Sequence, residues 1–251
     1  MSESPAVLVV VAGTGTEVGK TFVASALARE LRRRGASVAA RKPAQSFEPP
    51  VPPGTTDAEI LASATGEEAS DVCPPWRWYP RAMAPPMAAE SMGEAAFSLQ
   101  DLVGELRWPA GTEVALVELA GGLGSPQAAD GDGADMVELL RPDLVVLVAG
   151  PGLGTLSPIS LSARALATPL GFSPASPLAP AAASPPGLSP ASLSGPPLHR
   201  GRLVVFINRF DPADELHRAN KSWVAKRLGL SVTSEVEELA GAVAELLPKA
   251  L

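Results

Sequence analysis

The segment AVLVVVAGTGTEVGKT, residues 6–21, carries the clearest indication of fold in this 251-residue chain. Its first part, residues 6–12, is a continuous apolar run typical of a strand that is buried on both faces. The glycine-rich segment GTGTEVGKT follows at residues 13–21, and residues 20–34 then repeat apolar side chains at helical spacing. In such a turn, backbone N–H groups and the positive end of the helix dipole converge on one point. The pattern therefore predicts a phosphate-binding loop over residues 13–21.

Lys20 and Thr21 close this loop, and both suit a nucleoside triphosphate. The ammonium of Lys20 would neutralise the β- and γ-phosphates, and the hydroxyl of Thr21 would coordinate Mg²⁺. The spacing between the first and last glycines is one residue longer than in the common form of the loop. The alternative is a strand–helix turn with a chance Gly-Lys-Thr, but the flanking strand and helix favour the phosphate site.

Further apolar runs predict a sheet that alternates with helices. Strands are expected at residues 37–42, 113–119, 144–149 and 203–207. Helices are expected at residues 57–65, 94–106, 135–140, 157–167, 214–228 and 235–247, whereas residues 70–92 give little periodic signal. Alternation of this kind predicts an α/β fold of the P-loop NTPase type, with a mostly parallel sheet and helices on both faces.

One segment departs from the alternation. Length and a 46% hydrophobic composition predict one domain over residues 1–251. Residues 168–200 contain nine prolines and no charge before Arg200. Proline removes backbone donors and excludes both helix and central strand. We expect a flexible insertion at about residues 168–200, and a proline-rich docking site is the alternative.

Charge and cysteine content exclude several classes of function. A net charge of −7 argues against nucleic acid or an anionic membrane as a partner. No apolar stretch approaches the length of a membrane span, and no basic leader precedes residues 6–12. Cys73, the only cysteine, cannot form an intramolecular disulfide and fits a reducing compartment. We therefore expect a cytoplasmic location.

Other short motifs accompany the loop in a fixed order. They are residues 42–43 (Lys-Pro) with Ser46, Asp57 in TTDAEIL, YPRAMAPPMAAE at residues 79–90, Glu118 in VELAGG, and the strand end FIN at residues 206–208. Together with TGTEVGKT at residues 14–21, this set resembles the dethiobiotin synthetase family. The resemblance runs from the N-terminus to about Asn208, residues 168–200 excepted. The ordered set is more specific than any of its motifs.

The resemblance implies an ATP-dependent cyclo-ligase that forms C–N bonds. Dethiobiotin synthetases use ATP and CO₂ (bicarbonate) to convert 7,8-diaminopelargonate into the cyclic urea dethiobiotin, in biotin biosynthesis. A carbamate forms on one amine, its oxygen takes the γ-phosphoryl group as a carbamic-phosphoric anhydride, and the second amine displaces phosphate. The resemblance also implies a homodimer with each site completed across the interface.

The family's functional positions map onto this chain by the same resemblance. Lys42 and Lys20 would be catalytic, because they bring positive charge to the carbamate and the migrating phosphoryl group. The Mg²⁺ ligands would be Thr21, Asp57 and Glu118. ATP would be bound by Glu17, Val18, Gly19, Lys20, Thr21, Phe22, Asp57, Glu118 and Asn208. The diamine would be bound by Thr16, Ser46, Gly154 and Thr155.

The residues themselves leave some of these roles open. Glu118 ends an apolar strand, where a carboxylate is costly unless it is paired, so a metal role is favoured. Asp57 opens a helix, and its spacing fits a helix cap as well as a metal ligand. Without the resemblance, the position of Lys42 would indicate only a solvated lysine at the end of a strand. Asn208 offers the donor and acceptor that an adenine edge requires, or it is a polar turn residue.

Several positions depart from the family pattern. Leu119 and Phe47 stand where the family has glycine, and residues 157–158 are Ser-Pro where relatives usually carry Asn-His. Phosphate and metal chemistry is therefore better supported than the identity of the substrate. A degenerate ATP-binding relative that lacks this substrate is one alternative. A partition-type nucleotide switch is another, although Gly15 stands where those ATPases typically place a second lysine.

Overall fold

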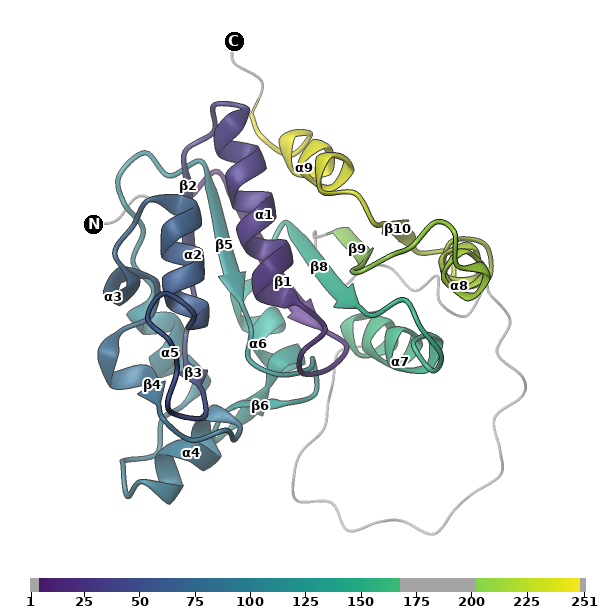
Figure 1. Cartoon of the computed structure of the whole chain (residues 1–251). Coiled ribbons are helices and arrows are strands. Elements are labelled where there is room, and N and C mark those ends of the chain that lie inside the picture. The colour runs from purple at the N-terminus through teal and green to yellow at the C-terminus, as the bar shows by residue number, and fades with distance from the viewer. Residues whose placement is uncertain (1–4, 168–201, 249–251) are drawn as a thin grey trace, which may run out of the picture.

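The computed structural model describes residues 5–167 and 202–248, which build a sheet with helices on both faces (Figure 1). The six strands lie in the order β10-β9-β8-β1-β5-β2, and every neighbouring pair is parallel. Their bounds are β1 Val7–Gly13, β2 Val38–Arg41, β5 Val114–Glu118, β8 Leu144–Ala149, β9 Arg202–Ile207 and β10 Ser231–Thr233. The predicted α/β fold with a parallel sheet is confirmed. The segment expected to be an insertion, residues 168–200, lies outside the described residues.

Alternate residues of the central strand β1 serve the two halves of the core. Val9 and Val11 pack with the cluster on one face, whereas Val10 and Ala12 pack with the cluster on the other. Side chains of a strand point to opposite faces in turn, and a strand covered on both sides is therefore apolar throughout. This explains the unbroken apolar run at residues 6–12.

Helices from distant parts of the sequence cover each face. On one face lie α1 Lys20–Arg33, α2 Asp57–Thr65, α3 Ala69–Val72 and α9 Val236–Ala244 (Figure 1). The core of the other face includes α4 Pro85–Ser91, α5 Leu99–Glu105, α6 Gly133–Leu140, α7 Leu156–Ala167 and α8 Glu215–Lys226. None of the helices within these described ranges is long and apolar enough to cross a membrane.

Some local predictions need correction. The helix expected at residues 94–106 is wrong in its first five residues, because α5 begins only at Leu99. Ser98 caps it: its hydroxyl oxygen accepts the N–H of Asp101 at 3.1 Å, and the Asp101 carboxylate accepts the N–H of Ser98 at 2.8 Å. Such a reciprocal pair fixes a helix start.

Several short elements carry no sequence periodicity and were not predicted. Residues 70–92 contain the end of α3, a 3₁₀ turn at Pro75–Arg77, β4 Trp78–Tyr79 and α4. Strand β4 pairs with β3 Gln45–Ser46, and β6 Pro126–Ala128 pairs with β7 Gly131–Asp132. Two or three residues are too few to show a period, so these pairs depend on tertiary packing.

The carboxyl ends of β1, β2, β5, β8 and β9 lie at one edge of the sheet, because all the strands run in the same direction. The loops that leave these ends, and the start of α1, meet there (Figure 1). Open parallel sheets bind ligands outside this edge.

Candidate functional site

The loop between β1 and α1 is fixed by the residue that follows β9. The side-chain amide of Asn208 donates to the carbonyl oxygen of Val18 at 2.9 Å. Gly19 caps α1 with a φ of 93°, and a Cβ atom there would lie 2.0 Å from Asn208 Nδ2. Only glycine combines this left-handed backbone with so close a neighbour. The last glycine of the motif therefore serves the packing of the loop against β9.

Lys20, the first residue of α1, lies over the loop that precedes it. Its side chain is buried, and its ammonium donates to the carbonyl oxygen of Gly15 at 3.2 Å. Burial lowers the pKa of Lys20 below its ordinary value, and the nearby ammonium of Lys42 lowers it further. An anion bound in the loop would relieve both effects, because it compensates the buried charge.

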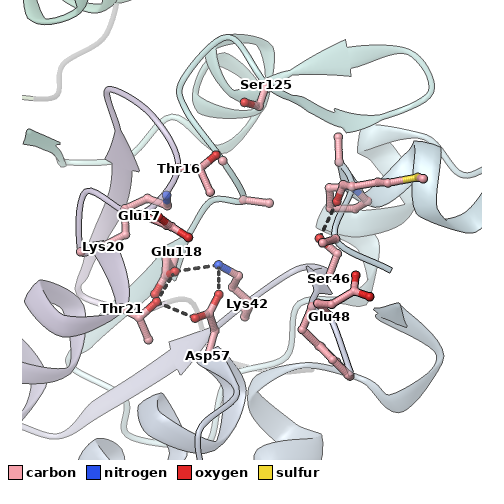
Figure 2. Close-up of a pocket in the computed structure, with 18 of the residues that line it drawn as sticks. Thr16, Glu17, Lys20, Thr21, Lys42, Ser46, Glu48, Asp57, Glu118 and Ser125 are labelled. Atoms are coloured by element: carbon pink, nitrogen blue, oxygen red, sulfur yellow. Dashed lines mark hydrogen bonds and ion pairs between the residues drawn. The ribbon is translucent and has the colours of Figure 1, made fainter. Parts of the chain in front are cut away.

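A second lysine joins two carboxylates at the same edge of the sheet (Figure 2). Lys42 directly follows β2, and its ammonium lies 2.6 Å from Glu118 Oε1 and 2.7 Å from Asp57 Oδ2. Glu118 is the last residue of β5, and Asp57 is the first of α2. Thr21 completes the cluster, with its hydroxyl oxygen 2.8 Å from Asp57 Oδ1 and 2.9 Å from Glu118 Oε1. Four separate elements thus place the predicted metal and phosphate residues together.

Burial sets the electrostatics of this cluster. The side chains of Lys42 and Glu118 are 3% and 1% exposed. Burial raises the pKa of Glu118 above its ordinary value, and Lys42 offsets this only in part. Burial opposes the charge of Lys42, but the two carboxylates beside it outweigh burial and raise its pKa. Asp57 is held below its ordinary pKa, because Lys42 outweighs burial there.

The cap of α2 settles one of the open questions about Asp57. Thr56, the preceding residue, caps the helix: its hydroxyl oxygen accepts the N–H of Glu59 at 3.3 Å, and the Glu59 carboxylate accepts the N–H of Thr56 at 2.9 Å. The carboxylate of Asp57 is therefore not the cap and faces Thr21 and Lys42.

The cluster has more acceptors than donors. The hydroxyl of Thr21 has one proton, yet two carboxylate oxygens lie within hydrogen-bond distance of it. Glu118 Oε2 is buried without any hydrogen-bond partner. A hard divalent cation bound to these oxygens would satisfy them, so the residues fit Mg²⁺. No group of three or more His, Cys, Asp or Glu side chains is placed to hold a metal in the described residues, so water and phosphate would have to complete the coordination.

These residues line a cavity of about 760 Å³. Of the residues predicted from the sequence, it brings together Thr16, Glu17, Gly19, Lys20, Thr21, Lys42, Ser46, Asp57 and Glu118. Residues that sequence reasoning did not assign also line it, among them Glu48, Met83, Gly121, Ser125 and Arg209. A cavity of this size with convergent polar groups is typical of a small-molecule site.

Other predicted residues do not line this cavity. Val18 contributes its carbonyl to the contact with Asn208, and Phe22 on α1 is 63% exposed. Gly154 and Thr155 precede α7, and the hydroxyl of Thr155 donates to the carbonyl of Gly150 at 2.6 Å. Gly154 has a φ of 89°, which glycine adopts without strain. The two residues shape the turn before α7.

The departures from the family pattern fall in three different environments. Leu119 is 1% exposed and packs in the core, so its side chain does not fill the cavity. Phe47 lines the cavity and meets the ring of Trp78 edge-on, with centroids 6.5 Å apart. Pro158 lines a smaller cavity of about 310 Å³, and Thr16 and Ser125 line both cavities. Leu119 therefore gives no support to a blocked site.

The chain matches a protein family and several known proteins over about 160 residues. A family model described as an AAA domain matches residues 8–169. The chain is 42% identical to the ATP-dependent dethiobiotin synthetase BioD of Caulobacter vibrioides (strain NA1000 / CB15N) over 162 residues, which are 62% of this chain and 72% of that protein. It is 39% identical to BioD of Rhodococcus jostii (strain RHA1) over 163 residues, 64% of this chain and 68% of that protein.

Among solved structures, the ParA family ATPase from Chlorobium tepidum TLS aligns with 98% of this chain and 93% of its own, at a TM-score of 0.46 and 13% identity. The relatives found by sequence have a higher identity to this chain, 42% and 39%. The family model indicates that the P-loop of this chain is that of a nucleotide-binding domain. From the extent and identity of these matches, the chain belongs to the dethiobiotin synthetase family.

Proposed function

We propose that this protein is an ATP-dependent dethiobiotin synthetase, which carboxylates 7,8-diaminopelargonate with CO₂ and closes the cyclic urea. The observation that carries the proposal is the cluster of Lys42, Asp57, Glu118 and Thr21 beside the phosphate loop. A P-loop alone is compatible with many nucleotide reactions. A buried lysine held next to the expected metal ligands offers a further cation for a second anionic substrate.

The nucleotide would bind with its phosphates at the start of α1. The backbone N–H groups of the loop and the ammonium of Lys20 would hold the phosphate oxygens. Thr21, Asp57 and Glu118 would hold Mg²⁺, which would neutralise charge on the β- and γ-phosphates. The free oxygen of Glu118 and the single proton of Thr21 support this assignment, because both leave acceptors for a cation.

The carbamate would bind on the side of the cavity lined by Lys42 and Ser46. Lys42 would stabilise the negative charge on the carbamate oxygen that attacks the γ-phosphorus. The hydroxyl of Ser46 donates its proton to the carbonyl of Met83 at 2.5 Å, so its oxygen is left as an acceptor for an N–H group of the substrate. Glu17 faces the same cavity and could attract the second amine, which must be free of its proton when it displaces phosphate.

We also propose that the protein is a homodimer, as expected for the family. Leu153, which precedes α7, and Leu161, which lies within it, are 93% and 62% exposed. Exposed apolar side chains near a cavity are common at interfaces between subunits. Light scattering at micromolar concentration should give twice the monomer mass, and a monomeric mass would contradict this part of the proposal.

ADP release tests the proposed reaction. We expect it to require both the diamine and bicarbonate, and to be lost in Lys42→Ala while ATP affinity stays largely intact. Lys226→Ala on the exposed end of α8 is the matched control, since it removes a lysine that does not line the cavity. ATP turnover that is indifferent to the diamine would refute the assignment. Equal loss of turnover and ATP affinity in Lys42→Ala would make Lys42 only a nucleotide ligand.

A further inference from the structure

Arg209 is a cation of the large cavity to which the proposed reaction gives no role. It follows Asn208 at the end of β9, and its side chain is exposed where it lines the cavity. Its side chain makes no hydrogen bond or ion pair with any residue in ranges 5–167 and 202–248. The neighbouring backbone is well fixed, because the N–H of Asn208 donates to the carbonyl of Ala149 at 2.9 Å and its amide holds the phosphate loop.

The backbone of Arg209 is in a conformation that arginine rarely adopts. Its φ is 55°, in the left-handed region. Within the described ranges, the other residues besides glycine with positive φ are Glu17 and Arg141, and Glu17 lines the same cavity. Strained residues cluster at ligand sites, where the surrounding structure holds them in place. The left-handed turn after β9 thus directs Arg209 to the cavity that Glu17 faces from the phosphate loop.

The charged residues that line the cavity indicate what Arg209 can bind. Four carboxylates and three cations line it, and Lys42 is already paired with Asp57 and Glu118. Lys20 and Arg209 are therefore the lining cations that have no carboxylate partner among the described residues. The phosphate loop has Gly15 where a second lysine would add charge. A guanidinium binds phosphate oxygens through two parallel N–H donors and keeps its charge at any physiological pH.

We infer that Arg209 is a phosphate-binding residue of the nucleotide site, which contacts the polyphosphate from the β9 side and adds a second cation to the one that Lys20 supplies. This inference rests on the proposed nucleotide site and adds a ligand to it. The position of Asn208 supports it, since the amide contact with Val18 keeps the end of β9 against the loop that binds the phosphates.

The test is the affinity of Arg209→Asn for ATP, inorganic tripolyphosphate and adenosine, measured by calorimetry in the presence of Mg²⁺. Asparagine tolerates positive φ, so this change removes the guanidinium with little strain on the backbone. We expect the affinity for ATP and for tripolyphosphate to fall roughly tenfold or more, as for the loss of one charge-assisted contact. Adenosine affinity should be unchanged. Arg209→Lys should recover part of the loss.

Arg141→Asn is the matched control. Arg141 is also an exposed arginine with positive φ, 50°, at the end of α6, but it does not line the cavity. Its variant should bind all three ligands as the wild type does. Unchanged ATP affinity in Arg209→Asn, or a loss that extends equally to adenosine, would overturn the inference.

Failure of this inference differs from failure of the proposed function. A wild-type protein that binds neither ATP nor tripolyphosphate would refute both. A wild type with diamine-dependent turnover, together with an Arg209→Asn variant of unchanged affinity, would refute only the role of Arg209.

Discussion

Lys42 and Glu118 are 76 residues apart in the sequence, and they form a buried ion pair with Nζ and Oε1 separated by 2.6 Å. The ammonium is shared, because Asp57 Oδ2 lies 2.7 Å from the same nitrogen. One cation thus serves two carboxylates that the sheet and α2 bring together. The arrangement links the stability of the site, its affinity for a metal ion and the proposed chemistry.

Removal of the lysine should destabilise the fold. In Lys42→Met the carboxylate of Glu118 stays buried without its cation, and the loss of one partner of a buried pair costs about 3–5 kcal/mol. The free energy of unfolding in urea, measured without metal, should fall by that amount. In the double variant Lys42→Met, Glu118→Gln the loss should be much smaller, because the carboxylate of Glu118 that Lys42 neutralised is then also absent. Equal stability of Lys42→Met and the wild type would show that water reaches Glu118.

The same geometry predicts competition between Lys42 and a divalent cation. Both would lie beside the same oxygens of Asp57 and Glu118, and two cations so close together repel each other. Lys42→Met should therefore bind Mn²⁺, a spectroscopic substitute for Mg²⁺, more tightly than the wild type in the absence of nucleotide. Electron paramagnetic resonance of free Mn²⁺ measures this, with Lys226→Met as control. Weaker binding by Lys42→Met would mean that the lysine helps to hold the site open for metal.

Gly19→Ala should disrupt the phosphate loop. The new Cβ would meet Asn208 Nδ2 at 2.0 Å, and the left-handed backbone adds about 1–2 kcal/mol of strain. We expect at least a tenfold loss of ATP affinity by calorimetry. Gly54→Ala is the control that adds backbone strain without a steric clash, because Gly54 has a φ of 80° and no atom within 4 Å of its Cβ position. We expect the double variant Gly19→Ala, Asn208→Ala to bind ATP more tightly than Gly19→Ala, because the clash with Asn208 is removed. If backbone strain alone were responsible, the double variant would bind ATP no more tightly than Gly19→Ala.

Cys73 should be inert in the folded protein. Its thiol is buried, and burial raises its pKa to about 12. At pH 8 a thiol-reactive reagent should label Cys73 only after unfolding in guanidinium chloride. Because the unfolded thiol loses its proton first, this group's contribution to the free energy of unfolding should fall as pH rises from about 9 towards 12. Rapid labelling of the native protein would show that the region around α3 opens readily.

The sequence predicted the elements that have a local cause. The valine run of β1, the glycines of the loop and the apolar strand ending in Glu118 each carry their signal within a few residues. Parallel strands then bring Lys42 and Glu118 to one edge of the sheet, so their meeting follows from the fold class.

What the sequence could not predict depends on packing between distant segments. The choice of Thr56 over Asp57 as the cap of α2, and the inward side chain of Leu119, follow from contacts in three dimensions. None of the sequence motifs includes Arg209. It reaches the cavity because the loop and the end of β9 meet through Asn208 and Val18, 190 residues apart.

In the proposed reaction, this site transfers the γ-phosphoryl group of ATP to an oxygen of the carbamate. In that reaction the attacking oxygen comes from CO₂, and it leaves with phosphate when the second amine breaks the C–O bond. With ¹⁸O-labelled bicarbonate and the diamine, measured before the label exchanges with water, mass spectrometry of the released phosphate should find one ¹⁸O atom per turnover. Released phosphate without ¹⁸O would mean that water attacks ATP and that no carbamate is phosphorylated at this site.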